Sequence, residues 1–295
     1  MKPSQSVRSH DSAASLELIA APLVRAGLLE DLGRGGDLTT DAIIDAKRRA
    51  RARIVARRGG IIAGLDAALL AFSMLDESVE SSPHAHDGAS VAAGEVVVEI
   101  EARARTLLTG ERTALNLFSR LSGIATATRR FVELVAGTRA QIADTRKTTP
   151  GLRVLERYAV RCGGGRNHRF GLDDGILIKD NHLALAGSIA EAVAAARARA
   201  GHMVKVEVEV DTIAQLREAL RSPIDAVLLD NMTTAQLREA VDLVQRSVIT
   251  EASGGVTEAS VGDIAQTGVD IISVGWLTHG APALDLSLEI ASGRA

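Results

Sequence analysis

The second half of the chain alternates short apolar runs with helical stretches, and this alternation limits the possible folds more than any other feature. Six runs are predicted to be strands: Gln141 to Asp144, Gly175 to Lys179, Val204 to Val210, Ala226 to Leu229, Val248 to Ala252 and Ile271 to Val274. Apolar strands separated by helices are typical of a parallel sheet with helices outside it. A barrel is favoured over an open sheet, because no Gly-x-Gly-x-x-Gly motif follows the first strand.

An internal repeat supports this alternation. The hexapeptide Ala-Gln-Leu-Arg-Glu-Ala occurs at residues 214–219 and again at 235–240, 21 residues later. That offset is the length of one strand–helix unit, so both copies are predicted to lie on the helices between strands.

Polar groups stand where each predicted strand ends, and barrels carry their chemistry at those ends. The groups are Asp144 to Lys147, Lys179 to His182, Glu207 with Glu209, Asp230 with Asn231, Ser253 to Gly255, and Gly275. A single strand-end acid usually caps the next helix, and Asp211 is predicted to do so for the helix from Thr212. Residues two apart in a strand point to the same face, so Glu207 and Glu209 share one face. Because charged side chains that alternate with valines are costly to bury, that face is predicted to line a polar barrel mouth.

The last two strands end in glycines, at Ser253 to Gly255 and at Val274 to Gly275. Barrels commonly bind phosphate at this place, through loop N–H groups and a helix N-terminus. Two simple tight turns are the alternative interpretation.

The stretch from Asp144 to His182 is locally cationic. It holds eight Lys or Arg and five acids, a balance of +3 in a chain of net charge −3, so the remainder carries −6. The cations flank three consecutive glycines, Gly163 to Gly165, where backbone N–H groups approach an anion closely. The stretch is therefore predicted to bind a ligand with several negative charges.

Three motifs in this stretch resemble the quinolinate phosphoribosyltransferase family, the carboxylating nicotinate-nucleotide pyrophosphorylases, which are type II phosphoribosyltransferases. They are Asp-Thr-Arg-Lys-Thr-x-Pro-Gly from Asp144, Tyr-Ala-Val-x-x-Gly-Gly-Gly-x-Asn-His-Arg from Tyr158, and Ile-Lys-Asp-Asn-His from Ile178. The similarity extends from about Leu18 to Leu288. Arg157 departs from the family, which has lysine there; the charge is kept but the hydrogen-bond geometry differs.

The resemblance implies an incomplete α/β barrel, short of eight strands, with a smaller N-terminal α/β sandwich domain. We expect a disordered lead-in over residues 1–12 and an N-terminal α/β domain over 13–117. The barrel catalytic domain is expected over 118–276, and the tail, 277–295, is expected to return to the first domain.

The resemblance also implies an enzyme, a glycosyltransferase of the pentosyltransferase class. It would transfer phosphoribosyl from phosphoribosyl pyrophosphate (PRPP) to quinolinate, giving nicotinate mononucleotide, pyrophosphate and carbon dioxide in NAD biosynthesis. Mg²⁺ is the implied cofactor, and the implied assembly is a homodimer with shared active sites, with higher assembly left open.

Individual roles follow from the resemblance. The two pyridine carboxylates are expected on Arg146, His168, Arg169 and Lys179, and on Arg112 of the neighbouring subunit. The expected catalytic residues are Lys147, near the ribose and pyrophosphate, and Glu209 and Asp230, which hold the ribose hydroxyls and a water-bound Mg²⁺. Further substrate contacts are expected at Thr145, Ser253, Gly254, Gly255, Val274 and Gly275, those from Ser253 onward with the 5′-phosphate.

Two other functions stay open. One is a paralogous phosphoribosyltransferase acting on another acidic acceptor, such as the relative found with molybdate transport systems. Nicotinate itself fits less well, because it offers one carboxylate to many cations. The other is a catalytically inactive anion-binding sensor, which has no need of Glu209 and Asp230 beside a polyanion.

Composition excludes several classes. Aromatic residues make up 2% of the chain, too few for the stacking platforms of a single-strand nucleic-acid site. The single cysteine, Cys162, excludes an internal disulfide and is interpreted as an inert small residue rather than a nucleophile. No apolar run reaches membrane-spanning length and residues 1–12 lack a signal-peptide core, so a cytoplasmic protein is expected.

The N-terminal half carries weaker signals. A helix is predicted from Ser15 to Leu32, with a kink or restart at Pro22, and Asp37 or Thr39 is expected to cap the next helix. The basic run 47–58 is interpreted as a strand with one wet face rather than a nucleic-acid patch.

Three further expectations concern residues 81–136. His84 and His86 are interpreted as an exposed loop rather than a metal site, and the glycine-spaced pattern after Gly88 as plain strands rather than a biotin or lipoate module. A helix is predicted from Glu111 to Ala136, with Arg112 at its start and a break near Gly123.

Overall fold

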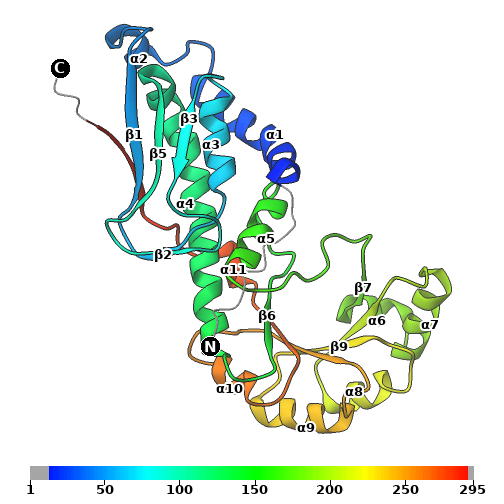
Figure 1. Ribbon diagram of the computed structural model, residues 1–295. Helices are drawn as coiled ribbons and strands as arrows, with labels where there is room; N and C mark the ends of the chain where they lie inside the picture. The colour runs from blue at the N-terminus through cyan, green and yellow to red at the C-terminus, as the bar shows by residue number, and fades with distance from the viewer. Residues whose placement is uncertain (1–12, 292–295) are drawn as a thin grey trace. The chain divides into compact units, whose positions relative to one another are not determined.

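The structure, a computed structural model, describes residues 13–291 and divides the chain into two compact units (Figure 1). The described part of the first unit comprises residues 13–126, 150–162 and 282–291, and the second comprises 127–149 and 163–281. The expected lead-in at 1–12 lies outside the described residues. The expected domain boundary at residue 117 falls inside an uninterrupted helix, and the two units divide further along it, after Thr126.

The first unit is built on an antiparallel sheet in the order β12-β1-β5-β3. Its strands are β1 (Arg49–Ala56), β3 (Glu80–Pro83), β5 (Val96–Arg103) and β12 (Leu286–Ile290), and a separate ladder joins β2 (Gly60–Ile61) to β4 (Ser90–Val91). The plain-strand interpretation of the pattern after Gly88 is confirmed by β4 and β5. Part of the expected tail returns to the first unit, because β12 pairs along β1 from Ala52↔Ile290 to Ala56↔Leu286, whereas residues 277–281 belong to the second unit.

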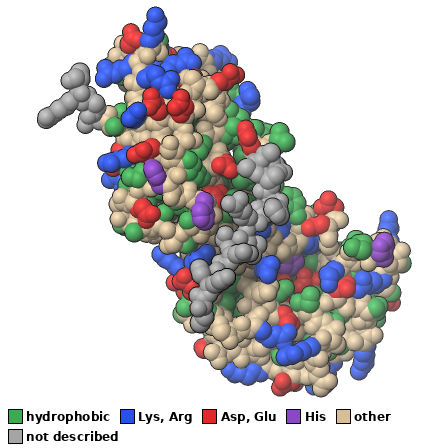
Figure 2. Space-filling model, viewed as in Figure 1, with side chains coloured by type: hydrophobic (Ala, Val, Ile, Leu, Met, Phe, Trp, Pro, Cys, Tyr) green, Lys and Arg blue, Asp and Glu red, His purple; other side chains and the backbone are tan. Residues whose placement is uncertain are grey.

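The basic run on β1 forms one exposed, charge-paired face. Arg51 donates to Glu101 at 2.8 Å and Arg53 to Glu289 at 3.0 Å, while Ala52 between them is buried. Acidic and basic side chains are interspersed over the visible face of this unit (Figure 2). The strand interpretation is confirmed, and arginines already paired with acids do not make a nucleic-acid patch.

Helices α1 (Ala13–Leu32), α2 (Leu38–Ile43), α3 (Leu65–Ser73), α4 (Ala104–Leu134) and α5 (Arg153–Cys162) complete the described helices of this region. Helix α1 continues through Pro22 without a restart. Asp37 is the residue that caps α2, where its side chain accepts the N–H of Thr40 at 3.0 Å.

Helix α4 corrects two expectations. It starts at Ala104, so Arg112 lies well inside the helix rather than at its start, and it continues through Gly123 without a break. The physical reason for Gly123 is close approach: a Cβ there would lie 2.1 Å from the Pro282 carbonyl oxygen and 2.8 Å from Ala283 Cα. The glycine marks where the returning tail crosses the helix.

We predict that Gly123→Ala destabilises the protein although alanine is the better helix former. Helix propensity favours alanine by about 1 kcal/mol, but overpacking against a backbone typically costs about 1–3 kcal/mol. The melting temperature, measured by calorimetry, should therefore fall. Gly262→Ala is the matched control, because in helix α10 the nearest atom to an added Cβ is Leu134 O at 3.8 Å. Equal melting of the two variants would contradict the close-approach explanation.

The second unit contains a six-stranded parallel sheet in the order β6-β11-β10-β9-β8-β7. The strands are β6 (Gln141–Ala143), β7 (Ile176–Ile178), β8 (Val206–Val210), β9 (Ala226–Asp230), β10 (Ile249–Ser253) and β11 (Ile271–Ser273). The helices are α6 (Asp180–Ala186), α7 (Ile189–Arg199), α8 (Ile213–Ala219), α9 (Thr234–Val244), α10 (Val261–Ala265) and α11 (Trp276–His279). Figure 1 shows α8 and α9 on the outer side of this sheet.

The two repeated hexapeptides lie on α8 and α9, as predicted. Each helix has the same capping box, Thr212 with Gln215 and Thr233 with Gln236. The expectation that Asp211 caps α8 is wrong. Thr212 is the N-cap, because its hydroxyl accepts the N–H of Gln215, three residues ahead.

The sheet curves as an incomplete barrel, and among the described residues β6 and β7 are not paired with each other. The open side is partly filled by the segment after α5, where Arg166 forms an isolated parallel bridge with Ala143. Valine, leucine and isoleucine dominate the buried residues of the strands, but Glu207 on β8 and Glu251 on β10 are buried as well. No helix in residues 13–291 combines the length and apolarity needed to cross a bilayer.

Candidate active site

A cavity of about 540 Å³ lies at the carboxyl ends of the parallel strands of the second unit. Eleven of its lining residues were predicted: Thr145, Arg146, Lys147, His168, Arg169, Lys179, Glu209, Asp230, Ser253, Gly254 and Gly255. Asn231, named above as a strand-end group without an individual role, also lines it, and four more residues line it without having been predicted: Leu177, Leu228, Glu251 and Ser273. A larger hollow of about 790 Å³ lies on the sheet of the first unit, but Arg51, Arg53 and their acidic partners line it, so we place no chemistry there.

Three predicted residues are not among those lining the cavity. Arg112 belongs to the first unit, where it is exposed on α4. Val274 is buried and donates its N–H to Ala143 O at 2.9 Å. Gly275 lies beside the cavity, because a Cβ there would come within 2.9 Å of Lys147 Cδ and 3.4 Å of Thr145 Oγ1.

The loop after β6 presents two cations. Its backbone is fixed by two threonines, since Lys147 N–H donates to Thr145 Oγ1 at 3.1 Å and Thr278 Oγ1 donates to Lys147 O at 2.8 Å. The side chain of Lys147 is exposed. Arg146 Nε is buried and has no hydrogen-bond partner within the described part of the chain. A buried N–H donor that lies at a cavity wall and has no partner in the described residues is suited to binding an anionic ligand.

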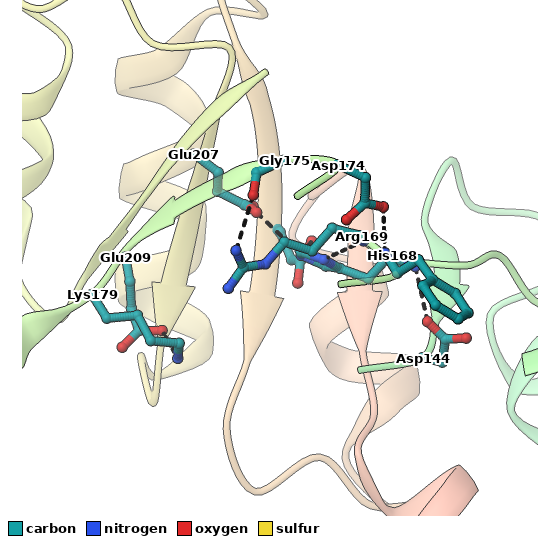
Figure 3. A network of polar contacts seen from close by, with 10 residues as sticks. Asp144, His168, Arg169, Asp174, Gly175, Lys179, Glu207 and Glu209 are labelled. Carbon is teal, nitrogen blue, oxygen red and sulfur yellow. Dashed lines mark hydrogen bonds and ion pairs between the residues drawn. The ribbon is translucent and has the colours of Figure 1, made fainter. Parts of the chain in front are cut away.

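Arg169 and Lys179 add two more cations to the cavity lining, and Figure 3 shows both side chains. Arg169 Nη1 donates to Gly175 O at 2.9 Å, and burial together with the nearby Arg146 lowers its pKa. Lys179 Nζ lies 2.6 Å from Glu209 Oε2, in an ion pair between the ends of β7 and β8. The two residues of this pair were expected to hold different substrates, and here they hold each other.

His168 has both ring nitrogens engaged. Nε2 lies 3.1 Å from Glu207 Oε2 and 3.4 Å from Glu251 Oε2, and Nδ1 accepts the N–H of Arg169 at 2.7 Å. Burial lowers the pKa of His168, but the hydrogen bonds to the two glutamates raise it more, to about 10. Arg169 N–H donates to Nδ1, so Nδ1 is unprotonated and the ring carries its proton on Nε2, facing the glutamates. Burial raises the pKa of Glu207.

The acids Glu209 and Asp230 end the neighbouring strands β8 and β9. Asp230 Oδ2 accepts from Asn231 Nδ2 at 2.6 Å, and Asn231 holds a left-handed backbone (φ 53°) that turns its N–H to Ser253 O at 2.9 Å. Two carboxylates from adjacent strands suit Mg²⁺, which keeps several waters and takes its other ligands from substrate oxygens. The donor set fits that ion.

The loop after β10 is shaped for a phosphate. Gly254 and Gly255 both have positive φ, 96° and 57°, a backbone conformation found in loops whose N–H groups bind anions. A side chain at Gly254 is excluded, because a Cβ would lie 2.1 Å from Asn231 Oδ1. Around Gly255 a Cβ would meet nothing within 4 Å, so the loop is open on that side.

Several groups are set aside by the structure. Burial raises the pKa of Cys162 to about 12, which favours the protonated thiol and is in keeping with the inert interpretation. His84 and His86 are exposed, as predicted, and neither belongs to a cluster of metal-ligating side chains in the described residues. The cavity lining holds no cysteine, and its two serines lack a base in the arrangement of a nucleophilic site.

Glu251 is the functional neighbour that sequence reasoning missed. The signal was available, because Glu251 stands two residues before Ser253 on β10 and so shares its face by the period that relates Glu207 to Glu209. The clustering of Glu207 and Glu251 on His168 could not be seen in the sequence, since it joins two strands and a loop.

The comparisons with known proteins agree with this geometry. The model of the quinolinate phosphoribosyl transferase C-terminal domain matches residues 124–289, and that of the N-terminal domain matches residues 37–122. The chain is 50% identical over 262 residues to a probable nicotinate-nucleotide pyrophosphorylase (carboxylating) of Bacillus subtilis, covering 89% of this chain and 90% of that protein. It is 44% identical over 279 residues to the Mycobacterium leprae nicotinate-nucleotide pyrophosphorylase (carboxylating), covering 92% and 97%.

A solved structure gives the same result. The nicotinate-nucleotide pyrophosphorylase of Francisella tularensis superposes with a TM-score of 0.89 at 39% identity, covering 93% of this chain and 96% of that one. Two domain models that together span most of the sequence, relatives of matching length, and a barrel that gathers the motif residues around one cavity lead to one assignment: the chain belongs to the quinolinate phosphoribosyltransferase family.

Proposed function

We propose that the protein transfers the phosphoribosyl group of PRPP to quinolinate and decarboxylates the product. The products are nicotinate mononucleotide, pyrophosphate and carbon dioxide, in the synthesis of NAD. One observation carries the proposal: a single cavity brings together four cations, Arg146, Lys147, Arg169 and Lys179, with the carboxylates of Glu209 and Asp230 at its edge. Both substrates are polyanions, and the acids are needed only if a sugar cation or a metal is also handled.

The acceptor side is assigned to the arginines. Quinolinate carries two adjacent carboxylates, which arginine pairs with in bidentate fashion. Arg146, whose buried Nε has no hydrogen-bond partner in the described residues, and Arg169 are suited to these carboxylates, and Lys179 adds a third charge. Arg112, exposed on α4, is proposed to reach the cavity of a second subunit, so the working assembly is a dimer.

The donor side is assigned to the loop glycines and the strand-end acids. The 5′-phosphate is proposed to lie on Ser253, Gly254 and Gly255, of which the two glycines have positive φ. Glu209 and Asp230 are proposed to hold the ribose hydroxyls and a hydrated Mg²⁺, which when bound neutralises charge on the pyrophosphate. Lys147 is placed to pair with the same leaving group.

The chain's contribution to the reaction is positioning and electrostatics. The bond from ribose C1 to the pyrophosphate oxygen breaks and its electron pair leaves with pyrophosphate, whose charge Lys147 stabilises. The ribose becomes oxocarbenium-like, and the carboxylates of Glu209 and Asp230 stabilise it until the pyridine nitrogen bonds to C1. The ring nitrogen is then cationic and accepts the electrons released when the adjacent carboxylate leaves as carbon dioxide, after which a proton from water replaces it.

Compartment and activity need direct tests. A cytoplasmic location remains part of the proposal, in keeping with a chain that has one cysteine. The activity is tested by incubating the protein with quinolinate, PRPP and Mg²⁺ and measuring nicotinate mononucleotide, pyrophosphate and carbon dioxide. Absence of all three products, with the substrates bound, would leave an anion-binding sensor as the function.

Substrate selectivity is a separate prediction. Quinolinate should be used at least about a hundredfold better than nicotinate or nicotinamide, by kcat/KM, because a missing carboxylate leaves cavity cations unpaired. The measurement is steady-state kinetics with each acceptor at saturating PRPP. Equal use of nicotinate would favour a paralogous transferase with another acceptor.

A further inference from the structure

Two buried glutamates, Glu251 in the cavity lining and Glu207 outside it, have no role in the function proposed above. Glu207 on β8 and Glu251 on β10 flank β9 and converge on His168 Nε2, at 3.1 and 3.4 Å. Their side chains are 11% and 3% exposed, and that of His168 is 15% exposed. One carboxylate oxygen of each, Oε1, is buried and has no hydrogen-bond partner in the described residues. Two carboxylates buried on one imidazole are costly, so the arrangement calls for an explanation.

A metal site is one explanation that the geometry argues against. The three ligand atoms lie within 4.8 Å of one another, as they would around an ion. A metal on Nε2 would place the ring proton on Nδ1, and ligating histidines normally donate that proton to an acceptor. Here Nδ1 faces a donor, the N–H of Arg169, at 2.7 Å. The ring therefore carries its proton on Nε2 and donates it to the glutamates.

The segment that bears His168 explains why it needs holding. Residues 167–175 form no helix or strand, and they follow a single bridge from Arg166 to the edge strand β6 on the open side of the barrel. Side chains replace the missing ladder. Asp144, fully buried, accepts from Asn167 Nδ2 at 2.6 Å and from His168 N–H at 2.8 Å. Glu207 and Glu251 contact the ring at Nε2, and Glu207 is seen in Figure 3.

Through that ring the glutamates also fix Arg169. Its N–H is tied to His168 Nδ1, and its guanidinium reaches across to Gly175 O at 2.9 Å. A shift of the His168 ring would therefore displace the backbone of Arg169 and with it the Arg169 side chain. We propose that Glu207 and Glu251 are positioning residues, which act through His168 to set Arg169 for the carboxylates of the acceptor. This inference rests on the proposed function for the identity of that acceptor.

The first test does not depend on any substrate. NMR of protein with ¹⁵N-labelled histidine should show His168, assigned by comparison with His168→Ala, protonated on Nε2 and unprotonated on Nδ1. The Glu207→Gln, Glu251→Gln double variant should lose that signal pattern. An imidazolium protonated on both nitrogens, or stoichiometric bound metal lost in His168→Ala, would overturn the assignment.

The second test measures the effect of the two glutamates on ligand binding. We expect Glu251→Gln and Glu207→Gln each to weaken quinolinate binding about tenfold, as a Kd measured by calorimetry, because an arginine set out of line loses a bidentate carboxylate contact. The Kd of PRPP with Mg²⁺ should change less than about threefold, since its proposed contacts lie on other loops. In a His168→Ala background, Glu251→Gln should add less than about twofold. Equal losses for both ligands, or an undiminished effect without His168, would overturn the proposal.

Controls separate positioning from stability and from the proposed function. Asp270→Asn removes a carboxylate at the opposite end of β10, where Asp270 accepts from Thr250, and should lower the melting temperature without changing the ratio of the two Kd values. If either glutamine variant fails to fold, Glu207→Asp and Glu251→Asp, which keep the carboxyl group but shorten its reach, are measured in the same way. If the wild-type protein binds quinolinate without forming product, the proposed function is refuted. The comparison of Kd values among the variants then still tests the positioning role.

Discussion

Replacing Lys147 with alanine is expected to lower kcat by about 10²–10³-fold while the protein remains folded. The side chain is exposed at the end of β6, and the loop is held by its backbone contacts with Thr145 and Thr278 rather than by the lysine side chain. Removing it should cost little stability, but it removes the cation placed beside the departing pyrophosphate. Steady-state kinetics and a thermal melt on the same preparation measure both effects.

The matched control is Lys205→Ala. Lys205 is also exposed and lies just before β8, at the amino end of the sheet, away from the cavity. This variant should keep normal turnover. Near-normal turnover of Lys147→Ala would show that the reacting phosphates lie elsewhere.

The second large effect concerns Arg112. Arg112→Ala and Lys147→Ala are each expected to be nearly inactive as homodimers, because each site lacks one cation. If Arg112 acts in the cavity of the partner subunit, a mixed dimer contains one site with both defects and one with neither. Refolding equal amounts together should then restore up to about a quarter of normal activity, since about half the dimers are mixed and each has one intact site.

The readout is the rise in activity on mixing, alongside proof that subunits exchange, for example by mass spectrometry of differently tagged chains. Arg105→Ala paired with Lys147→Ala is a suitable control, because Arg105 lies on the same helix and is committed to Asp41 and Ile44 of its own chain. That pair should show no gain beyond simple averaging of its parents. If the mixture of Arg112→Ala and Lys147→Ala exchanges subunits but stays inactive, Arg112 acts in the site of its own chain or in no site.

The parallel sheet was the most predictable part of the molecule. Its strands are short and mostly buried, and β7, β9 and β11 appear in the sequence as runs of apolar residues, whereas β8 alternates valine with glutamate. The predicted runs match the observed strands to within about two residues at each end, within the ordinary disagreement over strand limits. Since chemistry in a barrel lies at strand ends, predicting the strands also predicted most residues that line the cavity.

Two of the errors share a cause, which is contact between distant segments. Gly123 was expected to break a helix, but its role depends on Pro282, far along the chain. Glu251 was overlooked because its partner, His168, lies on a loop that no local pattern connects to β10. The cap of α8 was a local error: Asp211 and Thr212 are both good capping residues, and only the observed backbone shows which one reaches Gln215.

The tail strand β12 has a consequence for how the chain is made. The first unit begins the sequence but takes its outer strand from residues 286–290, so a ribosome releases that strand only after the whole barrel has been synthesised. Until then, β1 has no partner on that side, and its unpaired N–H and C=O groups are open to any other strand. The first part of the protein to be translated is thus the last to be completed, and nascent chains that stall or terminate early expose an aggregation-prone edge.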